Sequence, residues 1–113
     1  MAKKKVETRI KEEEQRLTDI LKDLDKNKLA ASAGLISDMA FQRISMDDLK
    51  EEINREGWKE EYQNGANQYG TKQSVSGATY ISLQKLYATN VKVLLDIVPP
   101  AQRESRLAAM MAK

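Results

Sequence analysis

The longest apolar repeat of this chain, residues 76–98, constrains the fold most strongly. Its sequence, SGATYISLQKLYATNVKVLLDIV, repeats apolar side chains at spacings of three and four, which is the period of an α-helix. One stripe of this helix contains Tyr80, Leu83, Tyr87, Val91, Leu94 and Val98, and much of a second contains Ile81, Leu86, Val93 and Ile97. A helix with two apolar faces is buried centrally or shared between subunits. In a chain of 113 residues we expect both uses at once.

A long helix that is shared between subunits predicts a homo-oligomer rather than a monomer. A lone domain of this length has a modest core, and oligomerisation often supplements the stability of such a domain. We expect an oligomer interface on the long helix that contains Tyr80, Leu83, Leu86, Tyr87, Val91 and Leu94.

Helical patterns also fill the first half of the chain. Residues 6–25 form an amphipathic pattern with a narrow apolar stripe, and residues 25–44 form a second pattern with a wider one. Residues 45–57 predict a third, short helix, because Ser45 is a favourable N-cap and Gly57 a favourable residue just beyond a helix end. The first half of the chain therefore predicts three helices.

A proline pair ends the long helix. Pro99 and Pro100 remove backbone donors and clash with a continuing helix, and residues 101–112 can begin a last one. No segment alternates convincingly at period two, so we predict an all-α fold of about four to five helices with a glycine-rich loop before the long helix. Residues 1–113 form a single domain with a basic N-terminal arm at 1–5, a helical oligomerisation core at 6–98 and a C-terminal tail or short helix at 99–113.

The glycine-rich segment YQNGANQYGTKQS, residues 62–74, resembles a phosphate-binding loop at first sight. Such a loop has the pattern G-x-x-x-x-G-K-[ST], and Gly65 and Gly70 have the required spacing. Thr71 and Lys72, however, stand in the reverse order, and a shift of one residue turns a side chain by about 100° on a helix. We therefore predict turns, with Ser74 or Ser76 capping the next helix. The polar and aromatic side chains either pack within the loop or form a contact surface.

The residue types that are absent restrict the chemistry. The chain contains no cysteine and no histidine, which removes disulfides, thiol chemistry, the common zinc sites and histidine acid–base catalysis. Only carboxylates remain as metal ligands, and only serine, lysine and carboxylates as catalytic groups. We predict a protein that is not an enzyme, with no catalytic residues, no bound metal and no cofactor.

Hydropathy gives no reason to expect a membrane partner. No apolar run approaches the roughly 20 residues that a membrane-spanning helix needs. The N-terminal sequence MAKKKVETRIKEEEQ has basic residues but no apolar core behind them, so it does not resemble a signal peptide. We expect a soluble intracellular protein.

The net charge of +2 conceals an uneven distribution. Residues 1–43 contain ten basic and eight acidic side chains, residues 44–61 three and seven, and residues 62–113 six and two. Basic ends around an acidic middle suit a chain that meets polyanions at its ends, and the alternative is that these charges only solubilise its surface. Phosphate contacts are predicted at the N-terminal arm and first helix, at Lys3, Lys4, Lys5, Arg9, Lys11 and Arg16.

The second half of the chain resembles the small terminase family of bacteriophages. The resemblance rests on EEYQNGANQYGTKQSVSGATYISLQKLYATNVKVLLDIVPPAQRE, which contains a Tyr-x-Asn-Gly loop with a later glycine, a long helix and a proline-rich break. A preceding short helix with Leu49, Ile53 and acidic flanks fits the same pattern. Unlike many small terminases, the chain has no turn glycine between two short helices before residue 34, so a helix-turn-helix is not evident.

The resemblance implies a non-enzymatic component of viral genome packaging. Small terminases form homo-oligomeric rings, recognise double-stranded viral DNA and pass it to the large terminase subunit, whose ATPase and nuclease they modulate. The corresponding location is the cytoplasm of the infected bacterial host. In this setting Arg103 and Arg106 are candidates for docking to the large subunit.

Two other functions fit the same sequence. The chain can be a structural or adaptor protein of a phage particle without a role on DNA, or a small DNA-binding regulator that acts as a dimer. In each case Trp58 and Tyr62, which lie in the acidic context REGWKEEY, are expected to be packing or docking residues rather than platforms for nucleic-acid bases.

Overall fold

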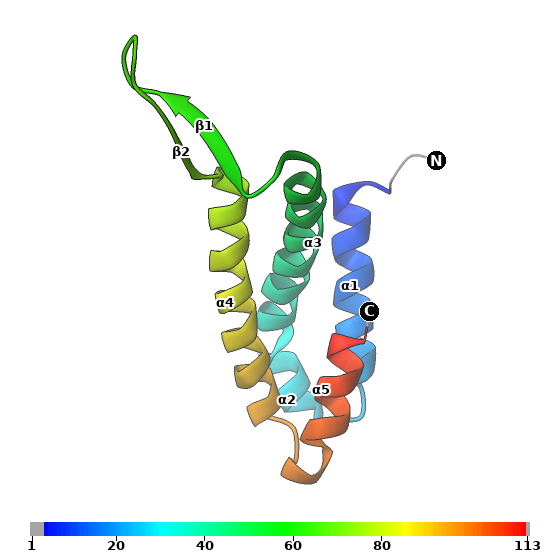
Figure 1. The fold of residues 1–113 in the computed structure, drawn as a ribbon. Coiled ribbons are helices and arrows are strands. Elements are labelled where there is room, and N and C mark those ends of the chain that lie inside the picture. The colour runs from blue at the N-terminus through cyan, green and yellow to red at the C-terminus, as the bar shows by residue number, and fades with distance from the viewer. Residues whose placement is uncertain (1–3, 113) are drawn as a thin grey trace.

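Three long helices and a projecting hairpin make up the fold of this computed structural model, which describes residues 4–112. The elements are α1 (Val6–Ile20), α2 (Lys26–Ala31), α3 (Ala33–Glu56), β1 (Lys59–Gln63), β2 (Tyr69–Gln73), α4 (Val75–Asp96), η1 (Pro100–Gln102) and α5 (Arg103–Met111). Figure 1 shows α1, α3 and α4 side by side, with α5 against one end of the bundle and the hairpin leaving the other. The molecule is elongated, with extents of 63 × 34 × 21 Å.

The predominantly helical architecture is confirmed, but the predicted boundary at Ser45 is wrong. Helix α3 continues without a break from Ala33 to Glu56. Ile44 and Met46 on either side of Ser45 are buried, and the apolar stripe continues to Ile53. Serine costs only a few tenths of a kcal/mol inside a helix, so packing on both sides outweighs its preference for a cap.

The predicted boundaries near residue 25 also change. Helix α1 ends at Ile20, and the carboxylate of Asp25 accepts hydrogen bonds from the backbone N–H groups of Asn27 and Lys28 at 2.7 and 3.3 Å. This cap begins the short helix α2, which ends at Ala31, so the predicted helix at 25–44 is divided at Ser32. The hydroxyl group of Ser32 donates a hydrogen bond to the carbonyl oxygen of Lys28 at 2.8 Å, a side-chain bond to the preceding turn that often bends helices.

The glycine-rich segment is an antiparallel hairpin, so the prediction of a fold without strands is wrong. Strands β1 and β2 pair Tyr62 with Gly70 and Glu61 with Thr71. A Cβ atom on Gly70 would lie 2.8 Å from Cζ of Tyr62, so the tyrosine ring needs a glycine opposite it. Both faces of the hairpin are largely exposed, which explains why its sequence lacks an alternating apolar pattern.

The same hairpin excludes the phosphate-loop interpretation. Thr71 and Lys72 lie on a strand, and the helix that follows begins only at Val75. That helix is capped by Ser74, whose Oγ accepts a hydrogen bond from the backbone N–H of Gly77 at 3.0 Å, which confirms one of the two predicted caps.

Trp58 fixes the base of the hairpin to α4. Its ring packs edge to face on Tyr80, with 6.1 Å between ring centroids, and its carbonyl oxygen accepts a hydrogen bond from the backbone N–H of Ser74 at 2.9 Å. A Cβ atom on Gly77 would lie 2.9 Å from the Trp58 ring, so the ring covers this glycine closely. The predicted packing role of Trp58 is confirmed.

The core lies where α1, α3, α4 and α5 meet. Its fully or almost fully buried members are Leu17, Leu21, Ile36, Met39, Met46, Tyr87, Val91, Leu94, Val98 and Met110. Most of the long apolar stripe of α4 is therefore used inside one chain.

Candidate functional site

Two C-terminal arginines stabilise the ends of other helices. Arg106 Nη1 donates a hydrogen bond to the carbonyl oxygen of Ile20, the last residue of α1, at 2.8 Å, and the same guanidinium pairs with Asp23. Arg103 Nε lies 3.1 and 3.0 Å from the carbonyl oxygens of Leu95 and Val98 at the end of α4. The last carbonyls of a helix have no partner within it, and positive charge there is favourable.

This use of Arg103 and Arg106 competes with their predicted role in docking to the large subunit. Both side chains are half-buried and their guanidinium groups are bonded to backbone carbonyls of the same chain. A partner can reach these groups only in competition with the helix ends that they stabilise.

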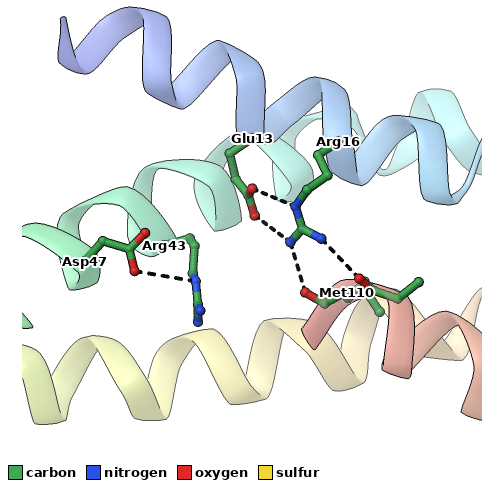
Figure 2. A network of polar contacts seen from close by, with 6 residues as sticks. Glu13, Arg16, Arg43, Asp47 and Met110 are labelled. Atoms are coloured by element: carbon green, nitrogen blue, oxygen red, sulfur yellow. Dashed lines mark hydrogen bonds and ion pairs between the residues drawn. The ribbon is translucent and has the colours of Figure 1, made fainter. Parts of the chain in front are cut away.

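Arg16 has a comparable role at the end of α5 (Figure 2). Its guanidinium donates to both carboxylate oxygens of Glu13 at 2.8 and 2.9 Å, and to the carbonyl oxygens of Ala109 and Met110 at 3.1 and 2.9 Å. The hydrogen bond with the buried Glu13 carboxylate raises the pKa of Arg16 above its ordinary value. Arg16 therefore connects α1 to α5, and a contact with phosphate would require it to release them.

The other predicted DNA-contact residues do not gather on one surface. Arg9 forms an ion pair with Asp48 at 2.8 Å, and Lys4 forms one with Glu12 at the same distance. Lys5 and Lys11 are exposed, whereas Lys3 lies outside the described residues. Because successive side chains on a helix are turned by about 100°, Lys11 lies on a different face of α1 from Arg9. The exposed cations of this set are Lys4, Lys5 and Lys11.

The predicted oligomer interface divides into buried and exposed parts. Tyr87, Val91 and Leu94 have exposed fractions of 5%, 7% and 0% within a single chain, so they belong to the core and cannot contact another subunit as predicted. Tyr80 and Leu83 are half-buried, and Leu86 is exposed. This correction follows from the packing of α4 against the core, which buries most of the first apolar stripe.

The predicted second apolar stripe of α4 is only partly exposed. Leu86 and Val93 have exposed fractions of 54% and 50%, whereas Ile81 and Ile97 are half-buried. Val75, exposed by 70%, lies at helical spacing from Leu86 and Val93 and extends their face. Phe41 on α3 is also exposed, by 58%. These side chains are the exposed large apolar residues of the two longest helices.

An open groove lies between α3 and α4 and was not anticipated from the sequence. It has a volume of about 470 Å³ and is lined by Arg43, Met46, Lys50, Tyr80, Gln84, Tyr87, Ala88, Val91, Lys92, Leu95, Leu107 and Met111. We refer to it as the α3–α4 groove. The length of the last predicted helix could have indicated such a groove, because this helix is much shorter than the helices beside which it packs.

Tyr87 lies in the wall of this groove with its hydroxyl group buried and without a hydrogen-bond partner. Burial raises the pKa of Tyr87, and the nearby charge of Glu13 raises it further. The Arg43 guanidinium lies 5.9 Å from the centre of the Tyr87 ring. Arg43 also forms a long ion pair with Asp47, with 3.7 Å between Nε and Oδ1 (Figure 2), but its Nε has no hydrogen-bond acceptor.

Neither a metal-ligand cluster nor a membrane-spanning helix occurs in residues 4–112. No group of three acidic side chains in this range is placed to hold a metal ion. No helix of the described chain is long and apolar enough to cross a bilayer.

Comparisons with known proteins identify no related protein. The chain matches no protein-family model, no curated protein sequence and no solved structure.

Proposed function

We propose that this chain is a phage small terminase, a non-enzymatic subunit that binds double-stranded viral DNA and modulates the ATPase and nuclease of the large subunit. The observation that carries the proposal is the order of the resembling residues. Asn64 and Gly65 occupy the hairpin turn, α4 supplies the long helix that follows, and Pro99 and Pro100 separate it from α5. The proposed location is the cytoplasm of the infected bacterial host.

A homo-oligomeric ring is part of this proposal. The exposed stripe formed by Val75, Leu86 and Val93 on α4 supports self-association. A stable interface buries about 1,600 Å² in total, and these side chains would form one part of such a surface. In a ring the interface repeats, so every copy contributes both its contacts and its charges.

DNA binding is assigned to the N-terminal end, with Lys4 and Lys5 as the described residues that carry it. Both are exposed, and the ion pair of Lys4 with Glu12 lies at the surface, where such pairs contribute little and exchange readily. One chain would bind weakly. A ring repeats the same cations around its axis, and linked weak contacts add through effective concentration.

The test is a pair of triple variants with equal loss of charge. Lys3, Lys4 and Lys5 are changed to alanine in one, and Lys22, Lys26 and Lys28, which are exposed at the opposite end of α1 and on α2, in the other. Binding to double-stranded DNA is measured by fluorescence anisotropy between about 50 and 200 mM salt, since each phosphate contact contributes about 0.9 to the log–log slope. We expect the first variant alone to lose affinity and slope while keeping its oligomeric mass.

The structural or adaptor alternative has one observation in its favour. Arg16, Arg103 and Arg106 are bonded inside the chain, which lowers the number of cations available to a polyanion. An oligomer larger than a dimer without salt-dependent DNA affinity would favour this alternative. A mass of two chains with such affinity would favour a dimeric regulator.

A further inference from the structure

The last helix leaves much of the bundle uncovered. At 1.5 Å per residue, α5 is about 14 Å long, whereas α3 and α4 are about 36 and 33 Å long. Figure 1 shows α5 against only the lower part of α1 and α4. The α3–α4 groove begins at Leu107 and Met111 on α5 and extends to Tyr80 near the start of α4. The groove therefore lies beside the part of α3 and α4 that α5 does not cover.

The lining of the groove defines the chemistry of its occupant. Apolar side chains form most of its surface, among them Met46, Val91 and Leu95, and methionine adapts readily to varied partners. Its three charged residues are Arg43, Lys50 and Lys92, and no carboxylate is among its lining residues. An apolar groove with a positively charged rim suits an amphipathic helix with acidic residues beside its apolar face.

Two buried donors point to the same ligand group. Tyr87 is only 5% exposed, and neither its hydroxyl group nor Arg43 Nε has a hydrogen-bond acceptor in the chain. A buried polar group without a partner is costly, so such groups are rare without a reason. Both residues line the groove, but these two atoms are covered and Arg43 Nε lies 3.7 Å from Oδ1 of Asp47, so a partner carboxylate reaches them only if the covering side chains move on docking.

We propose that the α3–α4 groove is a docking site for one amphipathic helix of a protein partner, which places a carboxylate at Tyr87 and Arg43 and acidic residues opposite Lys50 and Lys92. This proposal goes beyond terminase function and does not depend on it. No helix in the described part of this chain is suited to the site: α2 is short and carries Lys26 and Lys28, and the longer helices are already packed. The occupant that we propose is a different protein, and a second copy of this chain is an outcome of the test.

The experiment uses a display library of helical peptides of about 15 residues, panned on the intact chain. Apolar residues are fixed at helical spacing, and the flanking positions vary among Glu, Gln and Lys. We expect Glu to be enriched over Lys by about tenfold or more, since the combined effect of several charge pairs reaches that factor. The double variant Lys50→Glu with Lys92→Glu should invert the preference, whereas Lys22→Glu with Lys85→Glu, outside the groove, should leave it unchanged.

Two further variants locate the binding and the carboxylate. Ala88 lines the groove and is exposed, so Ala88→Arg should abolish binding of the selected peptides, whereas Ser82→Arg on another face of α4 should not. Tyr87→Phe should lower the binding affinity of Glu-containing peptides by about tenfold, the usual effect of losing a hydrogen bond to a charged group. The affinity of the matching Gln peptides should be nearly unchanged. Thermal unfolding of each variant checks that the fold is intact.

Every other outcome overturns the proposal. If no selected peptide loses binding on Ala88→Arg, the groove is not a site for a helix. If the selected peptides show no preference for Glu, the groove does not bind an acidic helix. If Ala88→Arg lowers the oligomeric mass in light scattering, the occupant is a second copy. If it lowers affinity for double-stranded DNA, the occupant is nucleic acid. The lysine variants that test DNA binding lie outside the groove, so the two proposals fail independently.

Discussion

Arg106 on α5 donates a hydrogen bond to the carbonyl oxygen of Ile20, where α1 ends. The two residues are 86 positions apart, so this contact connects the two ends of the chain. It removes an unpaired carbonyl and places a positive charge at the negative end of the helix dipole. The packing of α5 on α1 thus depends on a residue that, from sequence, resembles a surface cation.

Replacing Arg106 with alanine should destabilise the fold. Hydrogen bonds to charged groups contribute about 1.5–3 kcal/mol, and we expect a loss in that range in urea unfolding. Arg55→Ala is the control, because Arg55 is exposed and its ion pair with Glu56 lies at the surface; its effect should stay within about 0.5 kcal/mol. Equal losses for both variants would contradict the capping role.

Replacing Tyr87 with phenylalanine should not destabilise the isolated chain. The change removes a buried hydroxyl group that has no acceptor, so we expect a gain of up to about 1 kcal/mol near neutral pH. The pKa of Tyr87 is raised in the folded state by burial, so the unfolded chain loses this proton first, at about pH 10. Stability should therefore fall as pH rises above about 10, and the variant should fall less steeply. A steeper decline in the variant would show that the hydroxyl is partnered.

Two glycines should respond oppositely to alanine. Gly34 lies in α3 with no atom within 4 Å of the added Cβ, so Gly34→Ala should stabilise the fold by about 0.5–1 kcal/mol. Gly77→Ala places Cβ 2.9 Å from the Trp58 ring, which must move. Trp58 is the single tryptophan, so its emission reports the displacement directly. Unchanged emission in Gly77→Ala would mean that the ring does not cover this glycine.

Variants on the buried and on the exposed face of α4 should affect folding and self-association separately. Leu94 is fully buried, and Leu94→Ala should cost about 2–5 kcal/mol of unfolding free energy. Leu86 is exposed by 54%, so Leu86→Ala should change the stability of one chain by less than about 0.5 kcal/mol. We expect Leu86→Ala to lower the oligomeric mass in light scattering while Leu94→Ala acts mainly on unfolding. An unchanged mass in Leu86→Ala and in a Leu86→Ala, Val93→Ala double variant would place any interface elsewhere.

The parts of the fold that sequence reasoning predicted are those governed by long apolar periods. The long helix, its cap at Ser74 and its end before the proline pair follow from local patterns. The hairpin was missed because its pairing depends on Tyr62 covering Gly70 across the strands, and no apolar alternation accompanies it. The break at Ser32 was missed because the hydrogen bond of its hydroxyl group to the carbonyl oxygen of Lys28 does not show in an apolar period.

The candidate site was harder to predict because it depends on tertiary contacts. Charge counts treated Arg16, Arg103 and Arg106 as surface cations, although each is bonded to backbone carbonyls of another segment. The α3–α4 groove combines residues from three helices, and only their packing places Lys50 and Met111 in the lining of one groove. Periodicity identified two apolar stripes on the long helix, but not which of them would be buried against α3.

The arginines and the lysines of this protein differ in what they contact. Every lysine in residues 4–112 is exposed, whereas five of the six arginines are half-buried. Reagents or modifications that neutralise lysine would therefore alter what the surface attracts and leave the helix arrangement intact. Loss of arginine charge or geometry would instead loosen the helix ends. Affinity for a charged partner can consequently be tuned through lysines alone, without a cost in folding.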